Sequence, residues 1–294
     1  MIKRLMSHVP LGGEPYCEPF MGAATLFFAR PPAPVEVLND TDGDLVNLFK
    51  CLQNRETFEE LSRKIRYTLY ARQEFVEAIE ILKSDTDDKI KRAWAFFVVL
   101  NMSVSHTTKT TPGSWSRTFR SDNGCAINVN KWIMRLTMLE DWHKRLLLAQ
   151  IDNRDAIEVI KYWDADEAVF YLDPPYILDT RKTKKIYHQE LDNEYHRNLV
   201  QVILSCKGAV VLSGYEHEVY QPLIDAGWTC TKYQTACHAA VRTRASNIRG
   251  KNAALEKLPR TECVYSNPKA VELITIEKQP SSSVNRLFDL SPLP

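Results

Sequence analysis

A regular alternation of short apolar runs and amphipathic helical patterns after residue 150 constrains the fold of this chain most strongly. The runs 168–172 (AVFYL) and 209–212 (AVVL) are apolar at successive positions, as in strands that are buried on both faces. Helical patterns at 192–206 and 217–227 separate the strand-like segments, an order typical of parallel strands joined by crossover helices. We therefore predict an α/β fold with a doubly wound, mostly parallel sheet that ends in an antiparallel hairpin.

The 294 residues divide into three parts by pattern. Residues 1–55 and 149–278 carry the strand and helix alternation, and together they are expected to form a discontinuous catalytic domain. Residues 56–148 contain long helical patterns and a polar stretch, 103–130, and we predict a mainly helical insertion with a long functional loop. Residues 279–294 have the composition of a flexible tail.

Composition excludes several classes of protein. The formal net charge is +1, so any nucleic-acid partner has to be held by local patches. The longest apolar run, Ala93–Leu100, is far shorter than the roughly 18 residues of a membrane span. The N-terminus lacks the apolar core of an export signal, and the seven cysteines form no CxxC pair, which together predict a cytoplasmic protein with reduced thiols. Cys230, Cys237 and His238 come nearest to a metal cluster, but strand-borne core cysteines are the favoured interpretation, and no metal is predicted.

The first candidate motif is Glu18–Ala24 (EPFMGAA), where an early strand is expected to pass into a helix. Small residues allow close approach of the backbone to a ligand, and a helix N-terminus favours anionic groups. A tight turn without a ligand explains the motif equally well. The next strand-like segment ends in Asn39 and Asp40, where doubly wound folds hold the ribose hydroxyls of a nucleotide-type cofactor.

The second motif, Asp173-Pro174-Pro175-Tyr176, follows the apolar run 168–172. The amine of adenine is a poor nucleophile because its lone pair is delocalised into the ring. The carboxylate of Asp173 and the main-chain carbonyl of Pro174 are suited to accept both amine hydrogens, and the prolines fix these acceptors in place. Tyr176 is expected to stack on a base that has left the helix. A strand-terminating Asp-Pro turn explains Pro174 but not the whole tetrad.

Several segments together resemble a known family, namely YCEPFMGAA, EVLNDTDGDLVNLF, IDNRDAIEVI, VFYLDPPY, IYHQELDNEYH, VVLSGY and RTECVYSNP. They resemble the D12 class of DNA N6-adenine methyltransferases, the Dam-like group, and most closely its phage and prophage members. The resemblance runs over nearly the whole chain, whereas DPPY alone would not separate this group from other amino-group methyltransferases. It implies the fold of class I methyltransferases and S-adenosylmethionine as cofactor.

The resemblance also implies roles for individual residues. The cofactor would be bound by Glu18, Phe20, Gly22 and Asp40, with Asp155 beside its adenine; their neighbours Pro19 and Ala23, and Asp173 of the second motif, are included in the predicted cofactor site. Family members usually begin with a Gly-Gly-Lys segment that contributes to this site and that would stand a few residues before Met1; only IKRLMSHVP is found at this chain's start, so we expect that segment to be absent. A catalytically impaired DNA-binding remnant is therefore one alternative to an active DNA methyltransferase. A methyltransferase that acts on RNA adenine is another.

Local charge suggests how double-stranded DNA would be held. Residues 239–260 contain six cations against one anion. A second basic group directly follows the second motif, and a third lies in or beside the polar stretch, so phosphate contact is expected in these segments. We expect the 181–185 loop to clamp the DNA backbone and 103–130 to read sequence in the major groove. The predicted DNA contacts are Lys109, Arg117, Arg120, Arg181, Lys182 and Lys184. The NRLFDL segment of the tail is a candidate docking peptide, although a disordered end is favoured, and we expect a monomer or weak dimer.

Overall fold

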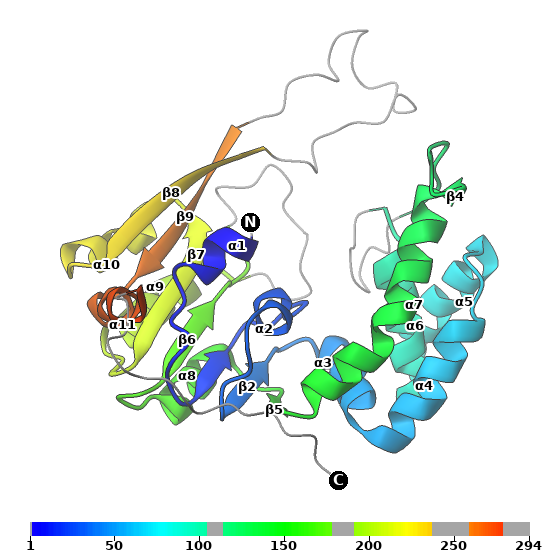
Figure 1. The fold of residues 1–294 in the computed structure, drawn as a ribbon, viewed down its shortest axis with the longest axis horizontal. Coiled ribbons are helices and arrows are strands. Elements are labelled where there is room, and N and C mark those ends of the chain that lie inside the picture. Colours follow the sequence, from blue (N-terminus) through cyan, green and yellow to red (C-terminus); the bar gives the residue numbers. More distant parts are fainter. Residues whose placement is uncertain (1, 105–113, 178–190, 237–258, 279–294) are drawn as a thin grey trace, which may run out of the picture.

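The computed structural model describes residues 2–104, 114–177, 191–236 and 259–278, and its centre is a seven-stranded sheet (Figure 1). The strand order is β5-β2-β1-β6-β7-β9-β8. The first five strands in this order pair in parallel, whereas β9 is antiparallel to both β7 and β8. The predicted α/β fold with its antiparallel C-terminal strands is thus confirmed. The strands are β1 Tyr16–Glu18, β2 Glu36–Asn39, β5 Ala149–Asp152, β6 Val169–Leu172, β7 Ala209–Tyr215, β8 Thr229–Ala236 and β9 Pro259–Ser266.

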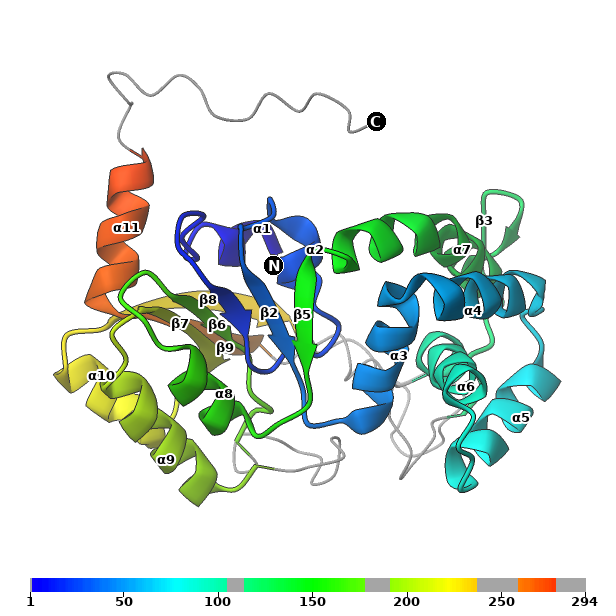
Figure 2. The same ribbon diagram turned by 90° about the horizontal axis from the view of Figure 1, so that it is seen from below.

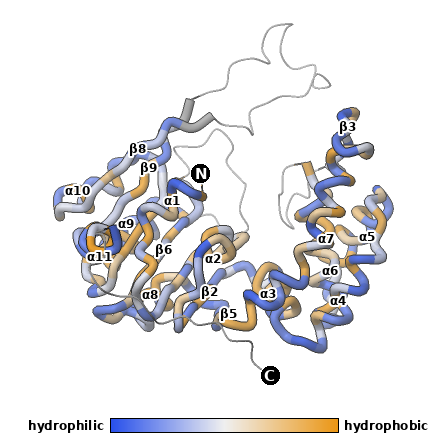
Figure 3. The backbone as a smooth tube through the Cα atoms, in the orientation of Figure 1, coloured by the Kyte–Doolittle hydropathy of each residue, from blue (hydrophilic) through white to orange (hydrophobic). Residues whose placement is uncertain are grey.

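Helices cover both faces of the sheet (Figure 2). One face packs against α8 (Ala156–Trp163), α9 (Asn193–Leu204), the 3-10 helix η2 (Glu218–Tyr220) and α10 (Gln221–Asp225). The other packs against α1 (Ile2–Met6), α2 (Thr25–Ala29) and α11 (Pro268–Lys278). Every residue of β6 is buried, so the apolar run AVFYL forms a strand covered on both faces, as its composition predicted. Figure 3 shows the hydropathy along the chain.

A group of five helices lies beside the sheet, namely α3 (Gly43–Gln53), α4 (Arg55–Tyr67), α5 (Arg72–Lys83), α6 (Lys89–Met102) and α7 (Ile127–Leu146) (Figure 1). Helix α6 is its centre, with eight buried residues. The helical core continues into the sheet domain through Met21, Phe27 and Leu38. The predicted domain limits therefore stay a prediction, because the two parts share apolar contacts.

Part of the predicted 103–130 loop is ordered. Strands β3 (Ser121–Asp122) and β4 (Cys125–Ala126) form a short hairpin, and α7 begins at Ile127. Asn123 and Gly124 have φ values of 49° and 78°, as a two-residue hairpin turn with the right twist requires. Sequence periodicity missed the hairpin because its strands have only two residues each, too few for an alternating pattern.

Two other elements differ from the sequence-based expectation. The helical pattern 217–227 forms only the short elements η2 and α10, because Pro222 lies directly after their junction. Helix α11 was not predicted, since only Ala270 of its residues is buried and its pattern is correspondingly weak. No helix within the described residues is both long and apolar enough to cross a lipid bilayer.

Helix α7 is tied to the sheet by buried charges. Glu36, at the start of β2, is fully buried and accepts hydrogen bonds from both terminal nitrogens of the Arg145 guanidinium. The bond to Glu36 Oε1 is 2.7 Å long. Arg30 lies 3.6 Å from the same carboxylate, and its guanidinium stacks 3.6 Å from the ring centroid of Tyr16. The end of α7 is therefore fixed against β2 and β1, the strands that precede Asp40 and the rest of the first motif.

Candidate active site

Carboxylates follow the strands at one edge of the sheet. Because β1, β2, β5 and β6 are parallel, their carboxyl ends lie at the same edge, which is where open α/β sheets bind ligands. Glu18 ends β1, Asp40 follows β2, and Asp173 follows β6. The fold therefore brings the two sequence motifs to one edge of the sheet.

Glu18 is a buried carboxylate with hydrogen-bond partners. Only 2% of the surface of Glu18 is exposed to solvent. Its Oε1 accepts a hydrogen bond of 2.7 Å from the hydroxyl of Tyr16. Desolvation raises the pKa of Glu18 from 4.5 to about 7, in spite of the Tyr16 bond, a backbone bond from Phe27 and the charge of Arg30. A group with this pKa changes its charge near neutral pH, as is common at functional sites.

Asn39 and Asp40 hold the turn after β1. The amide of the buried Asn39 donates to the carbonyl oxygens of Pro19 and Arg154, at 2.9 and 3.0 Å, and so joins the loops after β1, β2 and β5. The amide nitrogen of Gly22 donates to Asp40 Oδ2 at 3.0 Å, and Gly22 has a φ of 46°, in the region that favours glycine. Desolvation raises the pKa of Asp40.

Asp155 lies at the N-terminus of α8. Its side chain accepts a bond from the amide nitrogen of Ile157 at 2.9 Å and caps the helix. Its second oxygen accepts a bond of 2.9 Å from the hydroxyl of Tyr195 on α9. Tyr195 thus fixes the orientation of Asp155 from a helix that is distant in sequence.

Asp173 lies in a recess at the end of β6. Asp173 is exposed at the surface of this recess, yet the protein packed around its carboxylate disfavours the charged form, and this desolvation raises its pKa from 3.8 to about 6. The charge of Glu262 raises this pKa further, and a hydrogen bond with Tyr176 lowers it. The ring of Tyr176 packs against that of Tyr215, with centroids 4.3 Å apart and an angle of 33° between the planes.

A cavity of about 130 Å³ opens beside Asp173. Its polar lining comes from Asp173, Tyr176, Ser213, Tyr233 and Glu262, and its wall includes Leu5 of α1. This volume is comparable to the roughly 150 Å³ of an engineered cavity that binds benzene. None of the lining side chains that the structure describes carries a positive charge.

Comparison with known families shows to which family the chain belongs. The family model of D12 class N6 adenine-specific DNA methyltransferases matches residues 1–226, which include the Glu18–Ala24 segment, Asp40, Asp155 and the Asp173–Tyr176 tetrad. The chain belongs to this family. The resemblance stated from the sequence is therefore confirmed, and DNA is the substrate that the family implies. A search of the curated proteins finds no match to the sequence.

The other predicted residues of the methyltransferase have varied surroundings. Pro19 is buried, Phe20 is half-buried against the α8 and α9 face, and Ala23 is exposed. Pro174 is buried and Pro175 is half-buried. Arg117 and Arg120 are exposed beside the β3–β4 hairpin, far along α7 from the sheet (Figure 1). Lys109, Arg181, Lys182, Lys184, most of the 239–260 basic segment and the tail lie outside the described residues. The roles of these residues stay predictions.

Sequence reasoning did not single out Tyr195 or Glu262. Tyr195 belongs to a Tyr/His-rich stretch whose contacts depend on the packing of α9 against α8. Glu262 is one acidic residue at the head of an apolar strand, ECVYS, and this interruption was the available signal. Within the described residues no group of three or more His, Cys, Asp and Glu side chains is arranged to hold a metal ion. Cys237 and His238 are not among those residues.

Proposed function

We propose that this methyltransferase uses S-adenosylmethionine to methylate N6 of an adenine that is flipped out of duplex DNA. The observation that carries the proposal is the position of Asp173, which ends β6 in a cavity of about 130 Å³ and adjoins the strand that ends in Glu18. When bound, S-adenosylmethionine supplies a methyl group that is activated on a positively charged sulfur.

The chemistry of the site fits this cofactor. Glu18, Asp40 and Asp173 all have raised pKa values, and desolvation is the largest cause for each. A cationic group placed among these carboxylates would offset their desolvation, as a nearby opposite charge does. We propose that Glu18 and Asp173 attract the cationic end of the cofactor, that Asp40 holds its ribose, and that Asp155 lies by its adenine.

The residues around Asp173 would activate the adenine amine. The Asp173 carboxylate and the Pro174 carbonyl accept the two N6 hydrogens, which favours tetrahedral geometry at nitrogen and frees its lone pair. Tyr176 stacks on the flipped base. Because the acceptors are fixed by two prolines at the end of a buried strand, positioning supplies much of the acceleration.

The β3–β4 hairpin is the proposed DNA-contacting element within the described residues. Phe119 is 97% exposed, and the guanidinium carbon of Arg117 lies 5.9 Å from its ring centroid. An exposed aromatic ring can stack on a base, and a cation beside it can contact a phosphate. The hairpin is fixed to α7, because the amide of Asn128 donates to Ser116 and the backbone of Ile127 to Arg120.

Methyl transfer from radiolabelled S-adenosylmethionine tests the proposal. Duplex DNA and single-stranded RNA of matched sequence would be compared as acceptors, and calorimetry would measure cofactor binding. We expect label in duplex DNA only, together with saturable cofactor binding. Label in RNA only would overturn the choice of acceptor. DNA binding without any cofactor binding would show a non-catalytic remnant.

A further inference from the structure

A second acidic residue, Glu262, lines the same cavity as Asp173. Glu262 lies on β9, opposite Tyr215 of β7 and Tyr233 of β8 in the strand registers. Strand residues two positions apart share a face, so Glu262 is on the face of Val264, and that face also carries α1. Asp173 follows Tyr171, which belongs to the same face. Asp173, directly after β6, and Glu262, on β9, therefore line one cavity.

Among the described residues, few groups near Asp173 could replace this charge. Those that line the cavity or interact with Asp173 or with a lining residue are Glu18 on β1, Tyr171 on β6, Tyr176 after β6, Tyr215 on β7, Tyr220 on η2, Tyr233 on β8, Cys263 on β9, and Arg4 and His8 at and after α1. Arg4 and His8 both contact Tyr233. Of the charged groups around Asp173, Glu262 has the largest effect on the pKa of Asp173.

We infer that Glu262 is a positioning residue for methyl transfer, which acts through Asp173 by keeping that carboxylate basic while it holds the N6 amine. The inference rests on the proposed function. It concerns β9, which lies beyond the residues matched by the family model.

The chemical step shows why basicity matters. The bond between N6 and the methyl carbon forms while the bond between that carbon and sulfur breaks, and its electron pair stays on sulfur. N6 then carries a positive charge and loses one proton, which passes to the carboxylate of Asp173. A neighbouring negative charge raises the proton affinity of Asp173, which strengthens its hydrogen bond to N6 and favours the proton transfer.

Glu262→Gln tests this role, because it removes the charge and keeps the shape. Carbon-13 NMR of labelled aspartate carboxyl groups would measure the pKa of Asp173 in the free protein, with Asp173→Asn used to assign the signal. We expect the pKa to fall below its wild-type value of about 6 in Glu262→Gln. Glu272→Gln on α11, an exposed carboxylate that is not among the described lining residues of the cavity, is the control and should leave the pKa unchanged.

Kinetics provide the second measurement. In Glu262→Gln, the acid limb of the kcat/KM profile should move to lower pH, and kcat on the plateau should fall several-fold, short of the roughly hundredfold or larger loss expected without the base itself. Glu262→Asp should restore the wild-type limb in part, which a packing role would not do. An unshifted Asp173 pKa together with an unshifted acid limb in a folded Glu262→Gln would overturn the inference. Failure of the wild-type enzyme to methylate N6 would instead refute the proposed function.

Discussion

At the scale of single residues, the site depends on carboxylates whose pKa values are raised by desolvation. Of the site carboxylates, Glu18 is the most deeply buried. It accepts a hydrogen bond from the hydroxyl of Tyr16, and the ring of Tyr16 stacks against the guanidinium of Arg30. A buried acid of this kind weakens the folded state whenever it is charged, because the unfolded chain hydrates the carboxylate better.

The stability of the free protein should therefore depend on the charge of Glu18. Its pKa is raised in the folded state, so the stability that it contributes is fully present below about pH 4.5 and is lost as the pH rises through about 7. Glu18→Gln keeps an acceptor for Tyr16 and removes this dependence. We expect the difference in unfolding free energy between pH 5 and pH 8 to change by on the order of 3 kcal/mol in the variant.

Urea unfolding at several pH values measures this effect. Glu14→Gln, an exposed glutamate before the same strand, is the matched control and should follow the wild-type curve. Parallel curves for the wild type and Glu18→Gln would show that Glu18 titrates normally.

At the scale of elements, helix α7 links the hairpin to the strands of the site. It has 20 residues, which corresponds to roughly 30 Å of helix, with the β3–β4 hairpin at its start and Arg145 near its end. The bonds of Arg145 to Glu36 fix this end, and its guanidinium carbon lies 3.7 Å from the ring centroid of Phe27 on α2.

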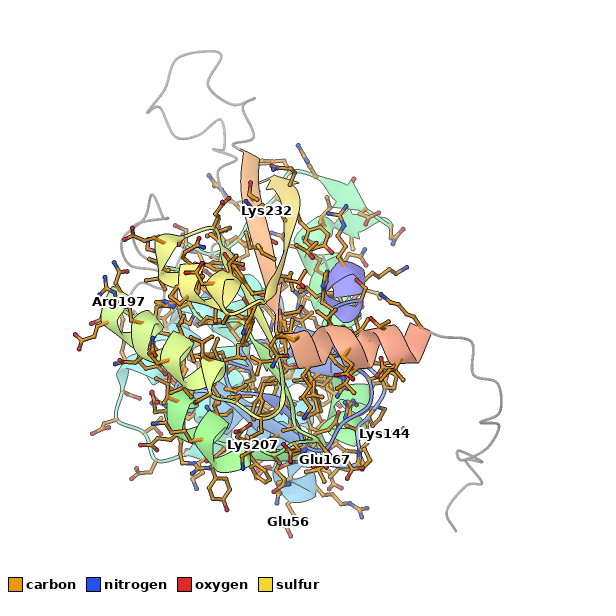
Figure 4. All side chains as sticks on the ribbon, turned by 90° about the vertical axis from the view of Figure 1, so that its left-hand side faces the viewer. Glu56, Lys144, Glu167, Arg197, Lys207 and Lys232 are labelled. Atoms are coloured by element: carbon orange, nitrogen blue, oxygen red, sulfur yellow. The ribbon has the colours of Figure 1, made fainter. Side chains whose placement is uncertain are left out.

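Removal of Arg145 should therefore destabilise the protein strongly. Arg145→Met leaves the buried Glu36 with Arg30 as its remaining ion-pair partner within the described residues, and losing one partner of a buried pair costs about 3–5 kcal/mol. Lys144, the preceding residue of α7, is exposed and is labelled in Figure 4. Thermal and urea unfolding of Lys144→Met should match the wild type. Equal stability of Arg145→Met and Lys144→Met would contradict a structural role for the ion network.

Arg117 and Arg120, just before the β3–β4 hairpin, should contribute to DNA affinity but not to the methyl-transfer step. Arg117→Ala with Arg120→Ala should weaken binding to duplex DNA and reduce the slope of log K against log salt by about 0.9 for each phosphate contact that is lost. Fluorescence anisotropy over a range of salt concentrations measures both quantities. Arg55→Ala, an 86% exposed cation on α4, is the control. An unchanged slope in the double variant would exclude phosphate contacts by these arginines.

The elements also show what the sequence could predict. The apolar runs predicted β6 and β7 because a strand covered on both faces has to be apolar throughout, and the Asp173–Tyr176 tetrad was recognised as a unit because it is continuous in sequence. The contact of Tyr195 with Asp155 and the position of Glu262 in the same cavity as Asp173 could not be predicted, because each joins elements that meet only through tertiary packing. The β3–β4 hairpin was too short to leave a pattern.

At the scale of the whole molecule, two units project toward the same side. The outer ends of β8 and β9 and the hairpin at the start of α7 both lie at the top of Figure 1, with the carboxyl ends of the parallel strands between them. A duplex held on this side would present a flipped base to the Asp173 cavity. This arrangement joins the DNA-binding and methyl-transfer parts of the proposal.

The identity of the methylated nucleoside tests the central proposal most directly. Duplex DNA treated with the enzyme and S-adenosylmethionine would be digested and its nucleosides quantified by mass spectrometry, for the wild type, Asp173→Ala and Asp166→Ala. Asp166 is an exposed aspartate shortly before β6, at the end of that strand away from the site. We expect N6-methyladenine from the wild type and from Asp166→Ala, and at least roughly a hundredfold less from Asp173→Ala, which should still bind the cofactor in calorimetry. A methyl group on another nucleoside, or undiminished N6-methyladenine from Asp173→Ala, would contradict the proposed role of the carboxylate at the end of β6.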